Sequence, residues 1–174
     1  MQTLPTRPLT EVLEALQAKG LRKGVGPMPG APLIDVPPVP SGHPRLDEAL
    51  RTGGWPRGSL ALLDAPIGSG ATSLALATLS ACQSAGGLVA WLDLEGSFDP
   101  STAARAGVNL EWLLVARPRD PVEAVELVAW LARTRLLDVL VLDLGLQSVS
   151  GRAVARLPDL LARFGGVALT LAAS

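Results

Sequence analysis

Residues 64–73 read Asp-Ala-Pro-Ile-Gly-Ser-Gly-Ala-Thr-Ser, a glycine-rich turn between an apolar run and a helical pattern. The apolar run from Ser59 to Asp64 predicts a strand, and the stretch from Thr72 to about Ala85 predicts a helix. Glycine lets a backbone turn tightly and approach a bound group closely. A strand, such a turn and a helix in this order favour an α/β fold with a ligand site at the turn.

The turn follows part of the phosphate-binding pattern Gly-x-x-x-x-Gly-Lys-Ser/Thr. In that pattern, backbone N–H groups hold the phosphates, the lysine reaches the β and γ oxygens, and the hydroxyl binds Mg²⁺. Here Gly70 and Thr72 keep the second glycine and the hydroxyl, while Ala65 and Ala71 replace the first glycine and the lysine. The loop shape is expected to persist without its main charge. This combination favours a nucleotide-hydrolase fold kept for a role other than hydrolysis.

Composition indicates a folded domain with a sizeable core. The 174 residues are 48% hydrophobic and 18% charged, which argues against disorder. The net charge of −1 gives no general attraction to nucleic acid. A mild basic bias near the C-terminus is interpreted as a solvated face, and it comes from Arg133, Arg135, Arg152, Arg156 and Arg163.

The chain has one cysteine, Cys82, and one histidine, His43. This excludes an internal disulfide and disfavours a zinc or iron–sulfur site. We expect Cys82 to be buried and His43 to lie at a helix start. No signal-peptide pattern and no apolar run of membrane-spanning length is present, so a cytoplasmic protein without membrane association is expected.

Residues 1–40 are interpreted as an N-terminal arm, and residues 41–174 as the core domain. The arm is predicted to hold a short helix over 9–20, with an apolar face of Val12, Leu13 and Leu16, before a connector rich in proline and glycine. Ile34 to Val36 can form a short edge strand. Two alternatives stay open: the arm packs on its own core, or residues 9–36 dock onto a partner or a second copy.

From Pro44 onward, strands and helices alternate. The strands are continuous apolar runs, typical of a mostly parallel sheet covered on both faces. In the helix capped by Asp120, Glu123 is expected to reach back to the cap. The predicted strands are 59–64, 88–93, 113–117, 139–143 and 167–172, and the predicted helices are 44–51, 72–85, 100–106, 121–134 and 152–164. The pattern predicts a three-layer α/β fold.

Ligands bind beyond the carboxyl ends of parallel strands, and three such ends carry candidate groups. The motifs that surround them are, in chain order, Leu46–Leu50, Gly53–Gly58, the loop 65–72, Asp93, Glu95, Asp99-Pro100, Ala106–Asn109 and Asp143. In type and order these motifs resemble the core of the RecA recombinase superfamily. The resemblance covers the chain from about Ser41 to its end and implies a RecA-like phosphate-loop fold.

The resemblance implies roles for individual residues. Glu95 matches the catalytic glutamate, and Asp143 matches the aspartate linked to Mg²⁺. With Asp143, the loop would form a degenerate site for ATP and Mg²⁺ through Gly68, Ser69, Gly70, Thr72 and Ser73. Each acid has a structural alternative as a solvated strand-end residue, and Thr72 has one as a helix-start residue.

Four signature positions of that site are altered. Besides residues 65 and 71, Thr102 stands where an aromatic ring would stack on adenine, and Ser174 stands where a glutamine would sense the γ-phosphate. The segment after Asp143 is too short for the family's DNA-binding loop. We therefore expect ATP and Mg²⁺ to bind weakly and not to be required, Glu95 to be vestigial, and the chain not to be an ATPase.

Within the superfamily, the sequence segments 86–93 and 113–120 resemble those of ImuA-type accessory proteins of bacterial mutagenesis cassettes. SulA-like division inhibitors are a related group. The favoured hypothesis is a non-catalytic accessory protein of the DNA-damage (SOS) response that binds a repair polymerase or RecA-type proteins, with weak or indirect contact to nucleic acid. The alternatives are a cell-division regulator and an active ATP-dependent recombination protein. The last would need another cation, such as a neighbouring subunit's arginine.

Overall fold

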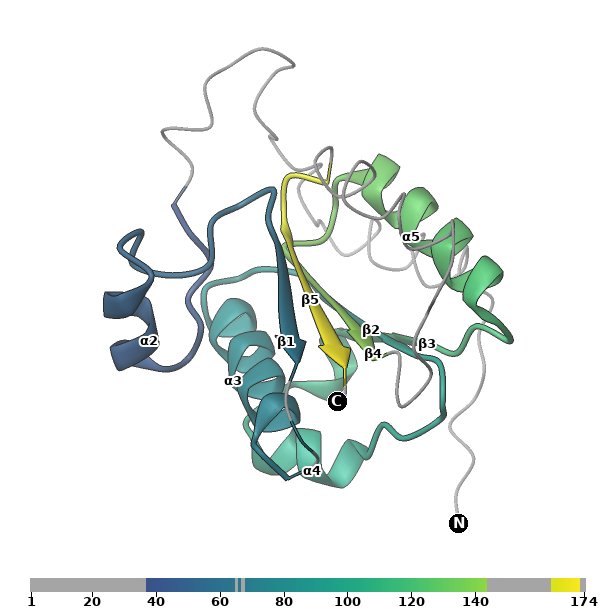
Figure 1. Cartoon of the computed structure of the whole chain (residues 1–174), viewed down its shortest axis with the longest axis horizontal. Coiled ribbons are helices and arrows are strands. Elements are labelled where there is room, and N and C mark those ends of the chain that lie inside the picture. The colour runs from purple at the N-terminus through teal and green to yellow at the C-terminus, as the bar shows by residue number, and fades with distance from the viewer. Residues whose placement is uncertain (1–36, 65, 67, 144–163, 173–174) are drawn as a thin grey trace.

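The computed structural model describes residues 37–64, 66, 68–143 and 164–172 (Figure 1). Within these ranges, five strands form one parallel sheet in the order β1-β5-β4-β2-β3. The strands are β1 Leu60–Asp64, β2 Val89–Asp93, β3 Leu113–Ala116, β4 Val139–Asp143 and β5 Val167–Ala172. The helices are α2 Pro44–Ala49, α3 Ala71–Ser84, α4 Pro100–Arg105 and α5 Pro121–Thr134, with a 3₁₀ turn at Leu110–Trp112. The predicted α/β fold is confirmed.

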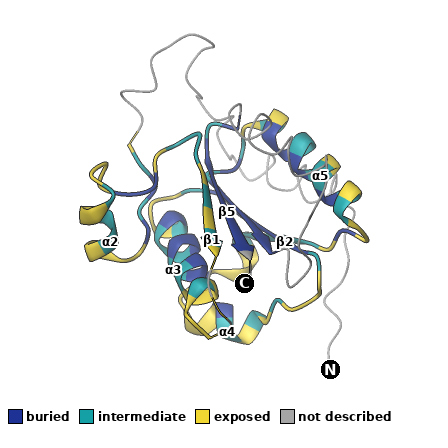
Figure 2. Ribbon diagram, viewed as in Figure 1, coloured by how far each residue is buried: buried dark blue, intermediate teal, exposed yellow. Residues whose placement is uncertain are grey.

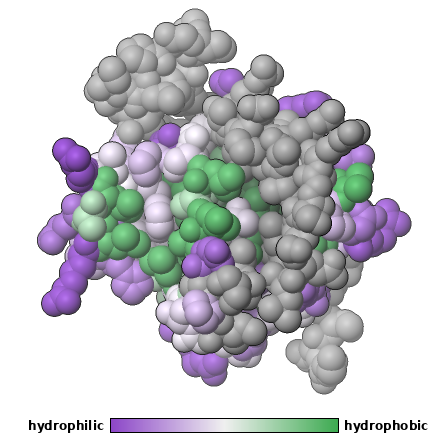
Figure 3. All heavy atoms as spheres, viewed as in Figure 1, coloured by the Kyte–Doolittle hydropathy of each residue, from purple (hydrophilic) through white to green (hydrophobic). Residues whose placement is uncertain are grey.

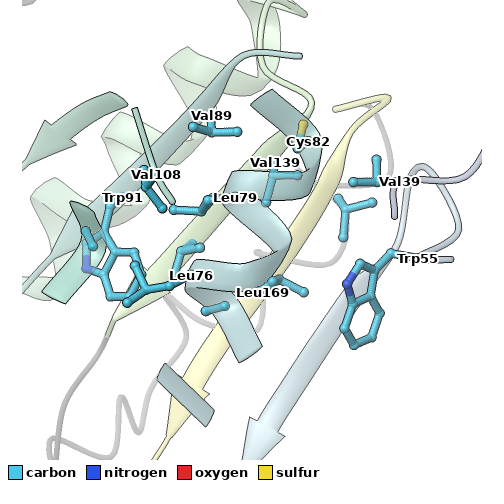
Figure 4. Packing of buried hydrophobic residues seen from close by; sticks show 14 of the residues in the cluster. Val39, Trp55, Leu76, Leu79, Cys82, Val89, Trp91, Val108, Val139 and Leu169 are labelled. Carbon is cyan, nitrogen blue, oxygen red and sulfur yellow. The ribbon is translucent and has the colours of Figure 1, made fainter. Parts of the chain in front are cut away.

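Helices cover the sheet on both faces, α3 on one and α5 on the other (Figure 1). Strand β2 shows how the sequence does this: Val89 and Trp91 pack in the α3 cluster, while Ala90 and Leu92 pack in the α5 cluster. Side chains along a strand alternate between the two faces of the sheet, so a continuous apolar run packs against the helices on both faces. Figure 4 shows Leu76 and Leu79 of α3 lying among the sheet residues of the first cluster.

Strand β1 differs from the expectation of strands buried on both faces. It lies at one edge of the described sheet, and its residues alternate between exposed and partly buried, whereas β2 and β4 are buried throughout (Figure 2). Leu60 and Leu62 are 38% and 62% exposed. Figure 3 shows apolar surface in the region of β1. Among the described residues, β1 packs only on the side that faces α3, through Ala61 and Leu63.

Two helix starts follow the capping chemistry that the sequence predicts. Asp99 accepts hydrogen bonds from the N–H groups of Ser101 and Thr102, and Asp120 accepts from those of Val122 and Glu123. The Thr102 hydroxyl, which also donates to Asp99, lowers the pKa of that carboxyl. His43 occupies the start of α2 as expected, although its side chain makes no capping bond.

The expectation for Glu123 was wrong in one detail. Its carboxylate reaches back one residue further than the cap and accepts from the N–H of Arg119, at 2.6 Å. The Arg119 guanidinium also donates to it, at 3.1 Å, and these bonds lower the pKa of Glu123. The charged side chain at 119 thus draws the carboxylate past the capping position.

Several predicted segments lie outside the described residues: the helix 9–20, the strand 34–36, the helix 152–164, and Arg152, Arg156 and Arg163. Arg133 and Arg135 are exposed at the end of α5. Within the described ranges, no helix is both long and apolar enough to cross a membrane.

Cys82 is buried in the α3 cluster as predicted, at 3% exposure. Burial, assisted by the nearby Asp138 carboxylate, raises the pKa of its thiol to about 12. Because the thiolate is the reactive form, the folded protein should react with a thiol reagent at pH 8 at least about 100-fold more slowly than the unfolded chain. Time courses with and without urea measure this ratio. Equal rates would contradict the burial of Cys82.

Candidate functional site

The carboxyl ends of all five strands lie along one edge of the sheet, because the strands are parallel. The register places Asp93 of β2 directly beside Asp143 of β4. On the other side of β2, Leu92 pairs with Ala116, so Arg117 follows at the level of Asp93. Asp64 ends β1, with β5 between it and β4. The described edge therefore carries three acids and an arginine.

The glycine-rich loop leads from β1 into α3. Gly68 and Gly70 adopt left-handed φ angles of 86° and 97°, which glycine tolerates and other residues rarely adopt. A Cβ added at either position would meet no atom within 4 Å, so the space beside both is open. Gly70 caps α3, and no side chain among the described residues makes a capping hydrogen bond there. The loop brings Gly68, Ser69, Gly70, Thr72 and Ser73 together as an exposed turn at the start of α3.

Ala71 is the first residue of α3, at the position of the lysine in the phosphate-binding pattern. Its methyl group is partly buried and packs against the apolar cluster beneath α3. The side chain at this position therefore contributes to the core and offers no charge to the loop.

Asp93 is completely buried and accepts hydrogen bonds from three protein donors. The N–H groups of Ser97 and Phe98 donate to its two oxygens, at 2.8 and 3.2 Å. The Nε of Arg117 donates to Oδ2 at 3.0 Å and forms an ion pair with it. Asp93 thus fixes the turn 94–98 and the end of β3 to the end of β2.

Asp143 is 9% exposed, and its Oδ2 accepts from the Ser97 hydroxyl at 3.0 Å. Its carbonyl accepts from the Leu94 N–H at 3.1 Å. The turn 94–98 is therefore bound to β4 as well as to β2. Glu95 lies on this turn and is exposed. The structure brings the acids at 93 and 143 together through Ser97.

A family model, the RecA N-terminal domain, matches residues 11–153 of the chain. The chain belongs to the RecA family. It is 42% identical to Protein RecA of Brucella anthropi over 113 residues, which are 65% of this chain and 31% of that protein. It is 37% identical to Protein RecA of Porphyromonas gingivalis over 137 residues (79% and 39%), and 39% identical to that of Thermus thermophilus over 138 residues (78% and 40%). The matched region spans about a third of the length of these curated relatives.

A magnesium-bound nucleotide, which the RecA family implies, fits this site in shape but not in charge. The turn at Gly68 and Gly70 leaves room for a phosphate at the start of α3. Ala71 supplies no cation, and oxygens of Asp93 and Asp143 already accept from Ser97, Phe98 and Arg117. Thr102 is engaged with Asp99 and Arg105.

Two residues of this site, Ser97 and Arg117, were missed by reasoning from the sequence. A signal for Arg117 was present: it ends the predicted strand 113–117, just as Asp93 ends the predicted strand 88–93. Recognising it required the knowledge that these two strands are neighbours. Ser97 carried no signal, because its role depends on how the turn folds over both strand ends.

Proposed function

We propose that this chain is a non-catalytic RecA-like accessory protein of the DNA-damage response, which acts by binding protein partners in a translesion or repair complex. The observation that carries the proposal is Ala71, which replaces the phosphate-binding lysine and packs into the core. A lysine there supplies the positive charge that neutralises the β and γ phosphates and the transition state of phosphoryl transfer. Without it, the degenerate loop is left as a structural connection between β1 and α3.

The state of the strand-end acids supports the same role. A carboxylate that serves Mg²⁺ or an attacking water needs oxygens open to them. Asp93 is buried beneath three protein donors, and Asp143 accepts from Ser97. We propose that Glu95 and the acceptor at Asp143 are vestigial, that ATP and Mg²⁺ bind weakly at Gly68–Ser73, and that neither is required.

The finer part of the proposal concerns the partners. An ImuA-type accessory role in the cytoplasm, with a repair polymerase or a RecA-type protein as partner, agrees with the family and with the motif phrases at 86–93 and 113–120. Residues 9–36 are the proposed docking arm, for a partner or for a second copy. Contact with single-stranded DNA is proposed to be weak because the net charge is −1, and salt-dependent because arginines would contact the phosphates.

Binding of the purified full chain to a purified translesion polymerase, to RecA and to a division protein tests the proposal. We expect binding to one of the first two that is unchanged by ATP and by the Ala71→Lys substitution. Binding to the division protein alone would favour the SulA-like alternative. Binding that requires ATP would favour an active recombination protein, and both outcomes would overturn the proposal.

A further inference from the structure

We infer that Arg117 is a built-in counter-ion at the acidic strand ends, so that the turn 94–98 is held closed without a bound divalent cation. This inference deepens the proposed function. It rests on one part of that proposal, namely that the protein acts without a bound nucleotide. The evidence is the contact of one guanidinium with the wholly buried carboxylate of Asp93.

The register explains why Arg117 reaches this carboxylate. Strands β2 and β3 pair up to Leu92 and Ala116, so the next residues on the two strands, Asp93 and Arg117, are neighbours across the sheet. The Nε–Oδ2 distance of 3.0 Å is typical of a charge-assisted hydrogen bond. The Arg117 side chain is 58% exposed, so it brings positive charge to Asp93 while much of its own surface keeps contact with water.

The two carboxylates at this edge of the sheet need a positive charge near them. Asp93 has no exposure to water, and Asp143 lies on the adjacent strand about 5 Å away. A buried carboxylate next to another carboxylate is unfavourable unless a positive charge offsets it. Either a divalent ion or an arginine can do so, and the chain supplies the arginine.

The ion pair between Arg117 and Asp93 also affects the turn 94–98, which carries Glu95. Asp93 holds the N–H groups of Ser97 and Phe98, and the Phe98 ring lies 5.2 Å from the Trp91 ring at a tilted angle. The charge of Arg117 therefore supports an acceptor that orders the whole turn. Arg117 is in this sense a positioning residue for the turn 94–98.

Thermal unfolding of the full chain, in a chelator and in millimolar Mg²⁺ or Ca²⁺, tests the inference. Wild type should have the same Tm in all conditions. Arg117→Met should lower the Tm by roughly 4–8 °C in chelator, and the divalent ions should restore part of that loss because they can neutralise the two carboxylates. Arg117→Lys keeps the positive charge but loses the planar guanidinium, so its Tm should lie between those of wild type and Arg117→Met.

Arg119→Met is the matched control, because the Arg119 side chain is 86% exposed and its ion pair with Glu123 lies on the surface. Its Tm should change by about 2 °C or less, without sensitivity to divalent ions. If Arg117→Met fails to fold, Arg117→Lys carries the test through its own response to the ions. The inference is overturned if wild type is itself stabilised by Mg²⁺, or if Arg117→Met is as stable as wild type. It is also overturned if the decrease in Tm of the Arg117 variants is the same with and without divalent ions. The binding of protein partners is measured separately and does not depend on these Tm values. Failure of this inference can therefore be distinguished from failure of the proposed function.

Discussion

Replacing Trp91 by alanine is expected to lower the free energy of unfolding by about 4 kcal/mol. Trp91 is 1% exposed in the centre of β2 and packs against Phe98 and the α3 cluster. Removing its indole leaves a cavity that a sheet paired on both sides of β2 cannot close. Urea denaturation followed by circular dichroism measures the change.

Two further tryptophan substitutions sharpen this prediction. Trp130 is only partly buried on α5, so Trp130→Ala should cost about 1–2 kcal/mol. Trp91→Phe should cost less than Trp91→Ala, because the ring is largely kept and the Trp91 Nε1 has no hydrogen-bond partner among the described residues. Equal losses for Trp91→Ala and Trp130→Ala would mean that β2 is not the centre of the core.

Replacing Asp93 by alanine should lower the free energy of unfolding by about 3 kcal/mol. The substitution leaves the N–H groups of Ser97 and Phe98 and the Arg117 guanidinium without their acceptor. Relief of repulsion with Asp143 offsets part of the loss. The same urea experiment measures it.

Asp64→Ala is the control for this substitution. Asp64 ends β1 at the same edge of the sheet but is exposed, so its removal should change stability by about 0.5 kcal/mol or less. If Asp93→Ala were as mild as Asp64→Ala, the hydrogen bonds to Asp93 would not hold the turn 94–98, and the acid would be an ordinary surface residue.

Most of the fold could be predicted from the sequence because its elements are short and clearly bounded. The apolar runs at 89–93 and 139–143 are flanked by residues that favour turns, and Asp99 and Asp120 each precede a proline that begins a helix. These are local signals, and local signals determine where an element begins. The five predicted strands between residues 59 and 172 agree with the structure to within one residue at each end.

Strand order is a property of the whole chain, and periodicity does not reveal it. The insertion of β5 between β1 and β4 separates the loop from Asp143 by one strand and leaves β1 at the edge. The exposure of Leu62 and the pairing of Arg117 with Asp93 both follow from that order. The candidate site could be predicted as a set of residues, but not as a network in which protein donors already occupy the acids.

Release of phosphate from ATP, in the presence of Mg²⁺ and single-stranded DNA, tests the central claim most directly. For wild type we predict no release above the uncatalysed background, and a Kd for ATP no better than on the order of 1 mM. Ala71→Lys should tighten binding without restoring turnover, because the resemblance assigns Ser174, and not a glutamine, to the γ-phosphate sensor position. Micromolar binding of ATP by wild type together with DNA-stimulated turnover would contradict the account.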